Sequence, residues 1–270
     1  MKKLNKVLAG VLCLAVIGAG TAAFAGCAND DVATLTITGS TSVQPLMEKL
    51  AAEYEKSHNV EINISGGGSG VGVTDARSGN NDFGMASRKL KDTETGVVAK
   101  TIANDGIALI ANTACTVTNV TTDEIKALYQ DGTAIQDTIK GAISREDGSG
   151  TRDAFQELLK ITSLYSDTGF EAGYSSTTAV ITKIKSNAQA NLVGYISMGS
   201  LNNEVKALSV GGVEATPANV KNGTYAIARP FNIVYKSEAD LSDEAKAFID
   251  WIMSSEGQAI VTSNGYISVL

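Results

Sequence analysis

The stretch that says most about this fold is Arg145-Glu-Asp-Gly-Ser-Gly-Thr-Arg152. It has hydroxyl donors at Ser149 and Thr151, and its glycines let the backbone approach a ligand closely. The next residues, 153–160, are predicted to form an amphipathic helix with Phe155, Leu158 and Leu159 on its buried face, which places the stretch at a helix N-terminus. Unpaired N–H groups and the positive end of the helix dipole favour an anion there, and the planar fork of Arg145 matches a tetrahedral oxyanion. The stretch therefore predicts an anion site.

Two other turns share this composition and this place between a strand and a helix. Residues 39–42 follow a predicted strand at 34–38, and residues 66–70 follow a predicted strand at 60–64. Ligands of open α/β sheets bind in the crevice at the C-terminal ends of the strands. We therefore expect an α/β fold with mostly parallel strands, in which three donor-rich turns meet at one cleft.

The rest of the chain continues the alternation of strands and helices. A capping box at Thr121 and Glu124 predicts the start of a helix. Short buried strands are expected at 82–86 and 107–110. The remaining predicted strands are 192–196, 205–208 and 231–235, and the remaining predicted helices are 43–54, 243–254 and 257–263.

The N-terminal residues have the pattern of an exported protein. Three early lysines precede an apolar run over residues 7–24, as in a secretory signal. The run ends Phe24-Ala-Gly-Cys27, which resembles the lipobox of bacterial lipoproteins, although Phe24 departs from the usual leucine. Residues 23–25 also fit the A-x-A site of ordinary signal peptidase. We expect residues 1–26 to be the signal, Cys27 to be lipidated and residues 27–33 to be a tether at the cell membrane.

Composition limits the other possibilities. About 240 residues remain after the signal, enough for two modest lobes or one large domain. The formal net charge is −7 and no basic run is present, so nucleic acid is not an expected partner. Of the three cysteines only Cys115 lies beyond Cys27, which excludes a disulfide framework.

Catalysis has little support in the sequence. His58 is the only histidine, and a solvated histidine at a helix end is the simpler interpretation. The sequence contains no G-x-S-x-G elbow, no phosphate loop with a lysine and no clustered metal ligands. We expect no catalytic residue, no metal and no cofactor, and we predict that the protein is not an enzyme.

Several motifs in one order resemble a known family. They are Gly39-Ser-Thr-Ser42, Gly66-Gly-Gly-Ser-Gly70, Asn81-Asp-Phe-Gly-Met-Ala-Ser-Arg88, Arg145-x-Asp-Gly-Ser-Gly-Thr151, Val193-Gly-Tyr-Ile-Ser197 and Ala228-Arg-Pro-Phe231. Together they resemble the phosphate-binding proteins of Pst-type ABC importers, in the periplasmic-binding-protein superfamily. The resemblance implies a type II-like fold of two lobes with two hinge crossovers and a ligand cleft between them. Lobe one would comprise residues 34–112 plus 231–270, and lobe two residues 113–230.

The same resemblance implies a set of site residues. Contacts to phosphate would come from Thr41, Ser42, Ser69, Asp82, Arg145, Ser149, Gly150 and Thr151. For Ser42 the backbone N–H is the safer expectation, because some relatives carry a bulkier residue there. Asp147 matches a residue that holds the binding arginine, and the neighbouring Arg152 could share the role of Arg145.

Asp82 bears on the choice of ligand. A buried carboxylate needs a donor, which hydrogen phosphate has and sulfate lacks, so Asp82 would admit phosphate and repel sulfate. Its alternative roles are to pair with Arg88 or to cap a turn.

The expected function is an extracytoplasmic, monomeric receptor that delivers inorganic phosphate to a membrane permease. The alternatives are a receptor for sulfate or molybdate, and an enzyme or sensor acting on a phosphorylated molecule.

Overall fold

The structure is a computed structural model that describes residues 32–165 and 170–270. The predicted signal at 1–26, the lipidation site Cys27 and most of the tether lie outside the described residues. No helix in the described part of the chain is both long enough and apolar enough to cross a membrane.

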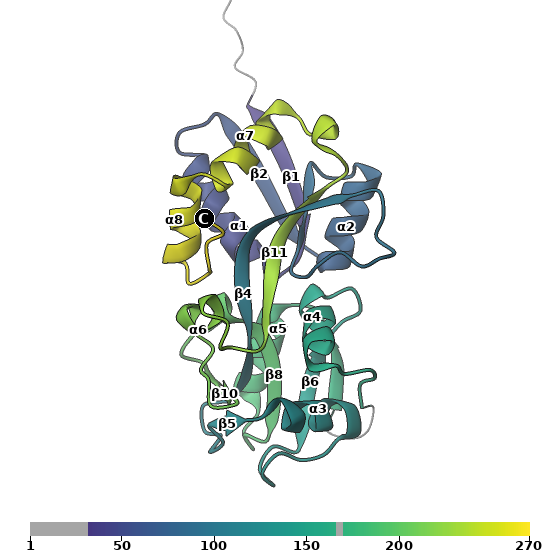
Figure 1. Ribbon diagram of the computed structural model, residues 1–270, viewed down its shortest axis with the longest axis vertical. Coiled ribbons are helices and arrows are strands. Elements are labelled where there is room, and N and C mark those ends of the chain that lie inside the picture. The colour runs from purple at the N-terminus through teal and green to yellow at the C-terminus, as the bar shows by residue number, and fades with distance from the viewer. Residues whose placement is uncertain (1–31, 166–169) are drawn as a thin grey trace, which may run out of the picture. The chain divides into compact units, whose positions relative to one another are not determined.

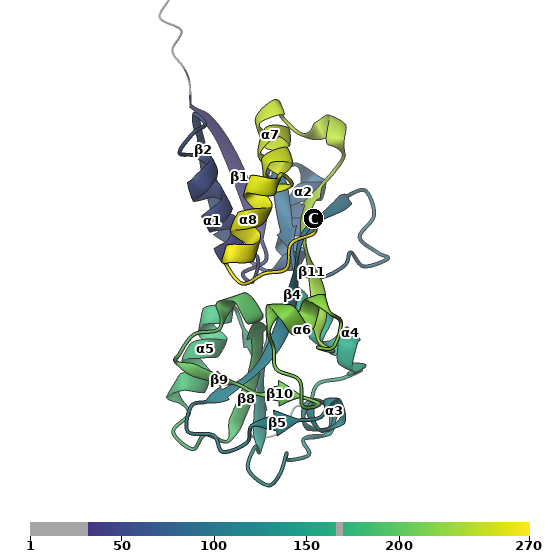
Figure 2. The ribbon, with the colours of Figure 1, turned by 60° about the vertical axis from the view of Figure 1, so that its left-hand side comes forward.

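The first group of elements is a parallel sheet with helices packed against it (Figures 1 and 2). Its strands lie in the order β2-β1-β3, and α1, α7 and α8 share one apolar core with them. The elements of this group are, in chain order, β1 (Ala33–Gly39), α1 (Gln44–Tyr54), β2 (Val60–Gly66), α2 (Ser69–Ser78) and β3 (Phe83–Ala86). The C-terminal end of the chain adds η2 (Glu238–Asp240), α7 (Asp243–Ile252) and α8 (Ser255–Ser263).

Two long antiparallel strands connect this group to the rest of the chain (Figure 1). They are β4 (Val98–Asn112) and β11 (Ala228–Tyr235). The first part of β4, up to Gly106, pairs with β11, while residues 107–111 pair with β8 of the second group. Because one strand belongs to both sheets, it joins the two groups directly.

The second group is built around a sheet in the order β4-β8-β6-β7. Strands β6, β7 and β8 run parallel, and the apolar core lies between this sheet and helices α3 and α4. The elements of this group are β5 (Asn119–Val120), α3 (Thr122–Asp131), β6 (Gly141–Arg145), α4 (Gly150–Leu159), β7 (Phe170–Tyr174), α5 (Thr177–Ser186), β8 (Leu192–Ser197), η1 (Met198–Ser200), β9 (Val205–Ala207), β10 (Ser209–Val210) and α6 (Pro217–Lys221).

The α/β fold is confirmed, with corrections in detail. The short strand expected at 107–110 is the end of the 15-residue strand β4. The expectation of mostly parallel strands fails at β4 and β11, because both pair antiparallel with their neighbours in the large sheet. Helix α5 was not predicted, and Leu158, expected on the buried face of α4, is 40% exposed. The capping box that starts α3 is confirmed.

Candidate anion-binding site

Buried hydroxyl groups gather where strand ends meet helix starts. Ser40 Oγ donates to Ser87 Oγ at 2.9 Å, and Ser69 Oγ lies 3.3 Å from the same Ser87 oxygen. Ser42 Oγ and Thr151 Oγ1 are 2.7 Å apart although 109 residues separate them in the sequence. We call this set the hydroxyl cluster: Ser40, Ser42, Ser69, Ser87, Thr151 and Thr177.

Local structure explains why the cluster forms here. Ser40 Oγ accepts hydrogen bonds from the backbone N–H groups of Ser42 and Val43. These two bonds stabilise the turn that leads from β1 into α1. Ser149 is the N-cap of α4 and accepts from the N–H of Arg152. The first N–H groups of a helix have no intrahelical acceptor, so each helix start adds donors as well as positive potential. The cluster is therefore surrounded by groups that favour an anion.

Arg145 lies beside the cluster at the end of β6 and is 1% exposed. Glu146 accepts from its Nε and Nη2, both at 2.8 Å, and the Tyr174 carbonyl also accepts from Nε. Nη2 donates in addition to Thr41 Oγ1 at 3.0 Å. The remaining nitrogen, Nη1, is buried and has no hydrogen-bond partner. Buried donors are nearly always paired, so Nη1 is a candidate donor to a bound acceptor.

Glycine lets the two sides of the site approach each other. The N–H of Gly70 donates to the Gly148 carbonyl at 3.0 Å. A Cβ placed on Gly150 would overlap Ser69 Oγ and lie 2.8 Å from Ser87 Oγ. The absence of a side chain at Gly150 is therefore what allows α4 to meet the start of α2.

A buried ion pair supports the site from behind. Asp105 on β4 and Arg229 on β11 face each other, with Arg229 Nη2 donating to Asp105 Oδ2 at 3.1 Å. Burial raises the pKa of Asp105 to about 6, although the Arg229 charge and a hydrogen bond from Ser197 oppose the shift. Arg229 Nη1 donates to the Ser87 carbonyl, so this pair holds the backbone of Ser87 in place.

A second group of charges joins the two sides at the edge of the site. Arg88 makes two hydrogen bonds of 2.7 Å to Glu94. Its Nε lies 2.8 Å from Asp153 Oδ2 on α4, without pointing directly at that oxygen, and Lys91 Nζ lies at the same distance. Burial alone would raise the pKa of Glu94, but the hydrogen bonds from Arg88 and from the Lys91 backbone lower it. Asp153 thus pairs with cations from the opposite side.

Most of the predicted site residues come together. Ser42, Ser69 and Thr151 belong to the hydroxyl cluster, Thr41 adjoins it in the chain and accepts a hydrogen bond from Arg145, and Gly150 and the N-cap Ser149 stand at its edge.

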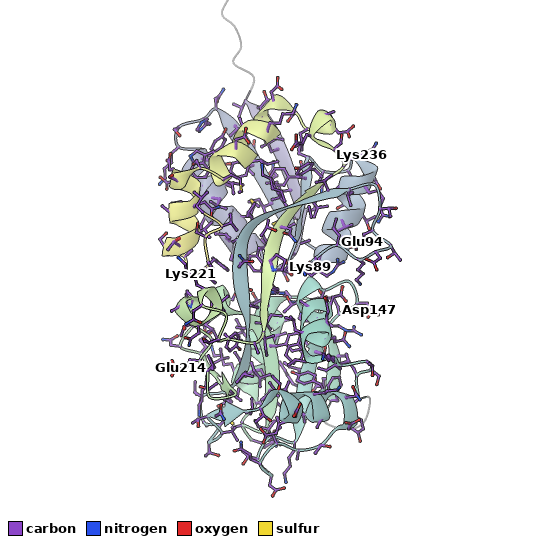
Figure 3. The ribbon with its side chains drawn as sticks, in the orientation of Figure 1. Lys89, Glu94, Asp147, Glu214, Lys221 and Lys236 are labelled. Atoms are coloured by element: carbon purple, nitrogen blue, oxygen red, sulfur yellow. The ribbon has the colours of Figure 1, made fainter. Side chains whose placement is uncertain are left out.

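The prediction for Asp147 needs correction, because Glu146 and not Asp147 holds Arg145. Asp147 is exposed at the start of α4 (Figure 3) and pairs with Arg152 at 2.6 Å.

Asp82 is not brought to the site. Its Oδ2 accepts from the N–H of Thr36 at 2.7 Å, and its own N–H donates to the Thr36 carbonyl. It does not pair with Arg88 either, because Arg88 is held by Glu94 and Asp153. A carboxylate that holds β1 to the start of β3 cannot also contact an anion at the strand ends. The predicted ligand contact of Asp82 is therefore wrong.

Sequence reasoning missed three members of the cluster. Ser40 and Ser87 lie inside motifs that were recognised, but neither was assigned a role. Thr177 belongs to the start of α5, where Ser175-Ser-Thr-Thr178 precedes apolar residues at helical spacing. That composition matches the three recognised turns and could have identified a fourth.

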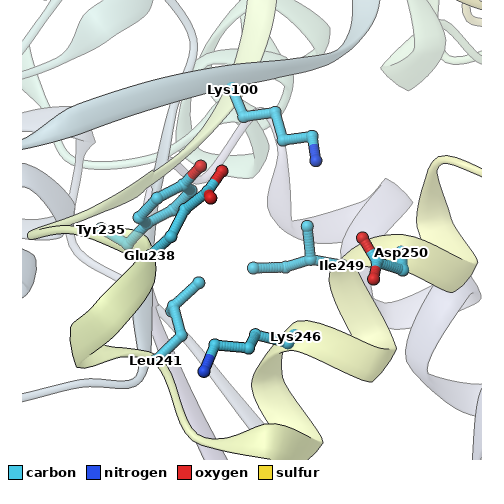
Figure 4. A pocket seen from close by; sticks show the side chains of 7 residues that line it. All are labelled: Lys100, Tyr235, Glu238, Leu241, Lys246, Ile249 and Asp250. Atoms are coloured by element: carbon cyan, nitrogen blue, oxygen red, sulfur yellow. The ribbon is translucent and has the colours of Figure 1, made fainter.

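Two cavities help to delimit the site. One of about 400 Å³ adjoins the cluster and is lined by Thr41, Ser176, Thr177 and Ser200 among others. Another, of about 170 Å³, lies in the first group of elements and is lined by Lys100, Tyr235, Glu238, Leu241, Lys246, Ile249 and Asp250 (Figure 4). Since none of the predicted residues lines the second cavity, it plays no part in the candidate site.

Comparison with known proteins agrees with this geometry. A protein-family model described as a PBP superfamily domain matches residues 28–256. The chain belongs to the PBP superfamily. A solved PBP structure, a putative phosphate ABC transporter substrate-binding protein with bound phosphate from Clostridium perfringens, is 39% identical with a TM-score of 0.81 and covers 88% of this chain and 100% of that one. An ABC-type phosphate transport receptor from Vibrio cholerae is 31% identical with a TM-score of 0.69, covering 86% and 99%.

Curated PBP relatives point the same way. Phosphate-binding protein PstS 2 of Streptococcus agalactiae serotype V is 44% identical over 131 residues, and the match spans 46% of this chain and 44% of that relative. Phosphate-binding protein PstS of Bacillus subtilis is 28% identical over 257 residues, or 87% of this chain and 81% of that one. The predicted resemblance to Pst-type phosphate-binding proteins is confirmed.

Proposed function

We propose that this protein is an extracytoplasmic receptor that binds inorganic phosphate and delivers it to the permease of an ABC importer. The observation that carries the proposal is Arg145 Nη1, a buried donor without a partner beside the hydroxyl cluster. A tetrahedral oxyanion would accept from this nitrogen and from several hydroxyls at once. The phosphate-binding relatives support the same ligand.

The proposed mechanism is closure of two lobes on the anion. Lobe one, residues 34–112 plus 231–270, would supply hydroxyls, and lobe two, residues 113–230, would supply Arg145 and the start of α4. The pairing of β4 with both sheets supports a boundary inside β4, near Gly106, rather than at its end. Neither side could remove water from the anion alone, so ligand would shift the population toward the closed form.

The proposal includes a lipid anchor at Cys27. Diacyl modification of that cysteine would hold the receptor at the membrane, where one acyl chain alone binds only marginally. Mass spectrometry of the native N-terminus tests this part. An unmodified terminus at residue 26 would mean that the protein is released.

A receptor or sensor for a phosphate ester is the second candidate. The cavity of about 400 Å³ beside Thr41 and Thr177 favours it, because a small polar substituent on phosphate would have room there. The proposed phosphate receptor needs no such substituent.

Calorimetric titration of the mature, ligand-stripped protein with phosphate and with glycerol 3-phosphate distinguishes the candidates. We expect saturable binding of inorganic phosphate in one-to-one ratio, and compaction in small-angle X-ray scattering when phosphate is added. Absence of phosphate binding, or tighter binding of the ester, would contradict the proposed function. Unchanged scattering despite binding would contradict the closure mechanism alone.

A further inference from the structure

Tyr195, a buried residue of strand β8, contacts two separate parts of the candidate site. Its ring stacks on Phe155 of α4, with the two ring centroids 4.0 Å apart. Its hydroxyl oxygen accepts from the backbone N–H of Arg145 at 3.3 Å and lies 2.6 Å from Ser144 Oγ. One side chain thus touches both the strand end that carries Arg145 and the helix that begins at Gly150.

Strand pairing explains why the N–H of Arg145 meets a phenol. Strands β6 and β8 are neighbours in the sheet (Figure 1), and within these two described strands their backbone pairing ends at Ala142 and Val193. On the other side of β6, the pairing with β7 shifts its register between Ile143 and Arg145. Arg145 therefore lies beyond the ladder that joins β6 to β8. Because a buried N–H without an acceptor is costly, the Tyr195 hydroxyl takes the place of the missing strand carbonyl.

The protonation state of Tyr195 suits this role. Burial raises the pKa of Tyr195, although its hydrogen bonds with Ser144 and with the Arg145 N–H oppose the shift. A neutral phenol accepts from the amide and directs its own proton to Ser144 Oγ. Loss of the phenol oxygen alone would therefore deprive two buried groups, the Arg145 N–H and the Ser144 hydroxyl, of this partner.

We propose that Tyr195 is a positioning residue that fixes the backbone of Arg145 for anion binding. The proposal rests on the proposed function and adds a residue to that same site. Contacts with Glu146 and Thr41 orient the guanidinium relative to its own backbone, whereas the Tyr195 hydroxyl fixes that backbone relative to β8. Without the hydroxyl the ligand-free strand end can relax, and a bound anion must restore its position. We expect this to weaken phosphate binding about fivefold to twentyfold.

The test compares Tyr195→Phe with Tyr129→Phe in calorimetric titration with phosphate and in thermal unfolding. Tyr129 is the matched control, because it is also fully buried, its ring lies 5.7 Å from that of Tyr195, and its hydroxyl donates to the Ile143 carbonyl of the same strand β6. Each substitution keeps the ring and removes one buried hydroxyl, so both should lower the Tm by similar amounts. Tyr195→Phe should bind phosphate about fivefold to twentyfold more weakly, and Tyr129→Phe within about twofold of wild type.

A double substitution separates positioning from general loosening of the fold. If Tyr195 acts through Arg145, then Tyr195→Phe should change the phosphate affinity of the Arg145→Ala protein by less than about twofold, because the effects of coupled residues are not additive. General loosening would lower both affinities by the same factor. Phosphorus NMR at millimolar phosphate measures the weak binding of the Arg145→Ala proteins.

Three results would overturn the proposal: unchanged affinity in a folded Tyr195→Phe protein, an equal loss in Tyr129→Phe, or an undiminished effect of Tyr195→Phe when Arg145 is absent. If Tyr195→Phe does not fold, Ser144→Ala takes its place in the same comparisons, since it removes the other partner of the phenol oxygen. Its expected loss of affinity is at least about twofold and depends on Arg145, and a smaller loss overturns the proposal. Failure of phosphate to bind wild type would overturn the proposed function instead.

Discussion

The side of the candidate anion site that is carried by α1, α2 and the end of β3 faces the side carried by β6 and α4, and the two differ in charge. The first contributes the hydroxyls of Ser40, Ser42, Ser69 and Ser87. The second contributes Arg145, the one cation whose donor lies free at the cluster in the described part of the chain. Because the second side carries the charge, we expect it to account for most of the attraction of a bound anion. The uncharged hydroxyls of the first side would complete the shell of donors around that anion.

Removing the charge of the second side should have the largest effect. Arg145→Ala deletes a buried guanidinium and leaves Glu146 without its partner. Loss of one member of a buried, charge-assisted contact costs about 2–5 kcal/mol, or roughly thirtyfold to several thousandfold in affinity. Phosphate titration measures the loss. A decrease of less than tenfold would mean that the hydroxyls dominate and that the comparison is reversed.

Filling the space between the two sides should have the next largest effect. In Gly150→Ala the new methyl would overlap Ser69 Oγ and crowd Ser87. Such overpacking costs about 1–3 kcal/mol, which corresponds to roughly fivefold to a hundredfold weaker phosphate binding if it acts on the closed form. The free energy of unfolding of the ligand-free protein should change little, since alanine is accommodated at the first position of a helix. A large loss of stability with unchanged affinity would contradict a role in closure.

The ion pairs at the edge of the site should contribute less. Asp153→Asn removes the negative charge that Arg88 and Lys91 share across the two sides. Partly exposed pairs contribute about 0.2–1 kcal/mol, so phosphate should bind up to about fivefold more weakly and dissociate faster. The difference between mutant and wild type should shrink as inert salt is added, because salt screens exposed charges. A difference that does not depend on salt would indicate loss of packing instead.

Arg152→Ala is the matched control for Arg145 and should have the smallest effect. Its side chain pairs with the exposed Asp147 and reaches the Arg145 carbonyl, not the cluster. Affinity for phosphate should change by less than about threefold, as expected for an exposed pair. If Arg152→Ala proved the weaker binder, the assignment of the binding arginine would be wrong.

Some parts of the candidate site can be predicted from the sequence and others cannot. The turns at 39–42, 66–70 and 148–151 were recognisable because Ser, Thr and Gly between a strand and a helix have a local meaning. Leu158 shows the limit of such patterns, since its helical spacing agrees with Phe155 and yet it is exposed. Whether a helix face is buried depends on which other elements pack against it, and the periodicity of a sequence carries no information about those elements.

The sequence by itself determined the α/β class and the starts of several helices, and it predicts Arg145 as an anion-binding residue, because these follow from short-range propensity, capping and donor chemistry. Only the tertiary structure decided which side chains meet. It brought Ser42 to Thr151, made Glu146 rather than Asp147 the partner of Arg145, and held Asp82 to Thr36 of β1 while Ser87 entered the cluster. These outcomes depend on strand register and on how β4 joins two sheets, and both are set by packing between residues far apart in the chain.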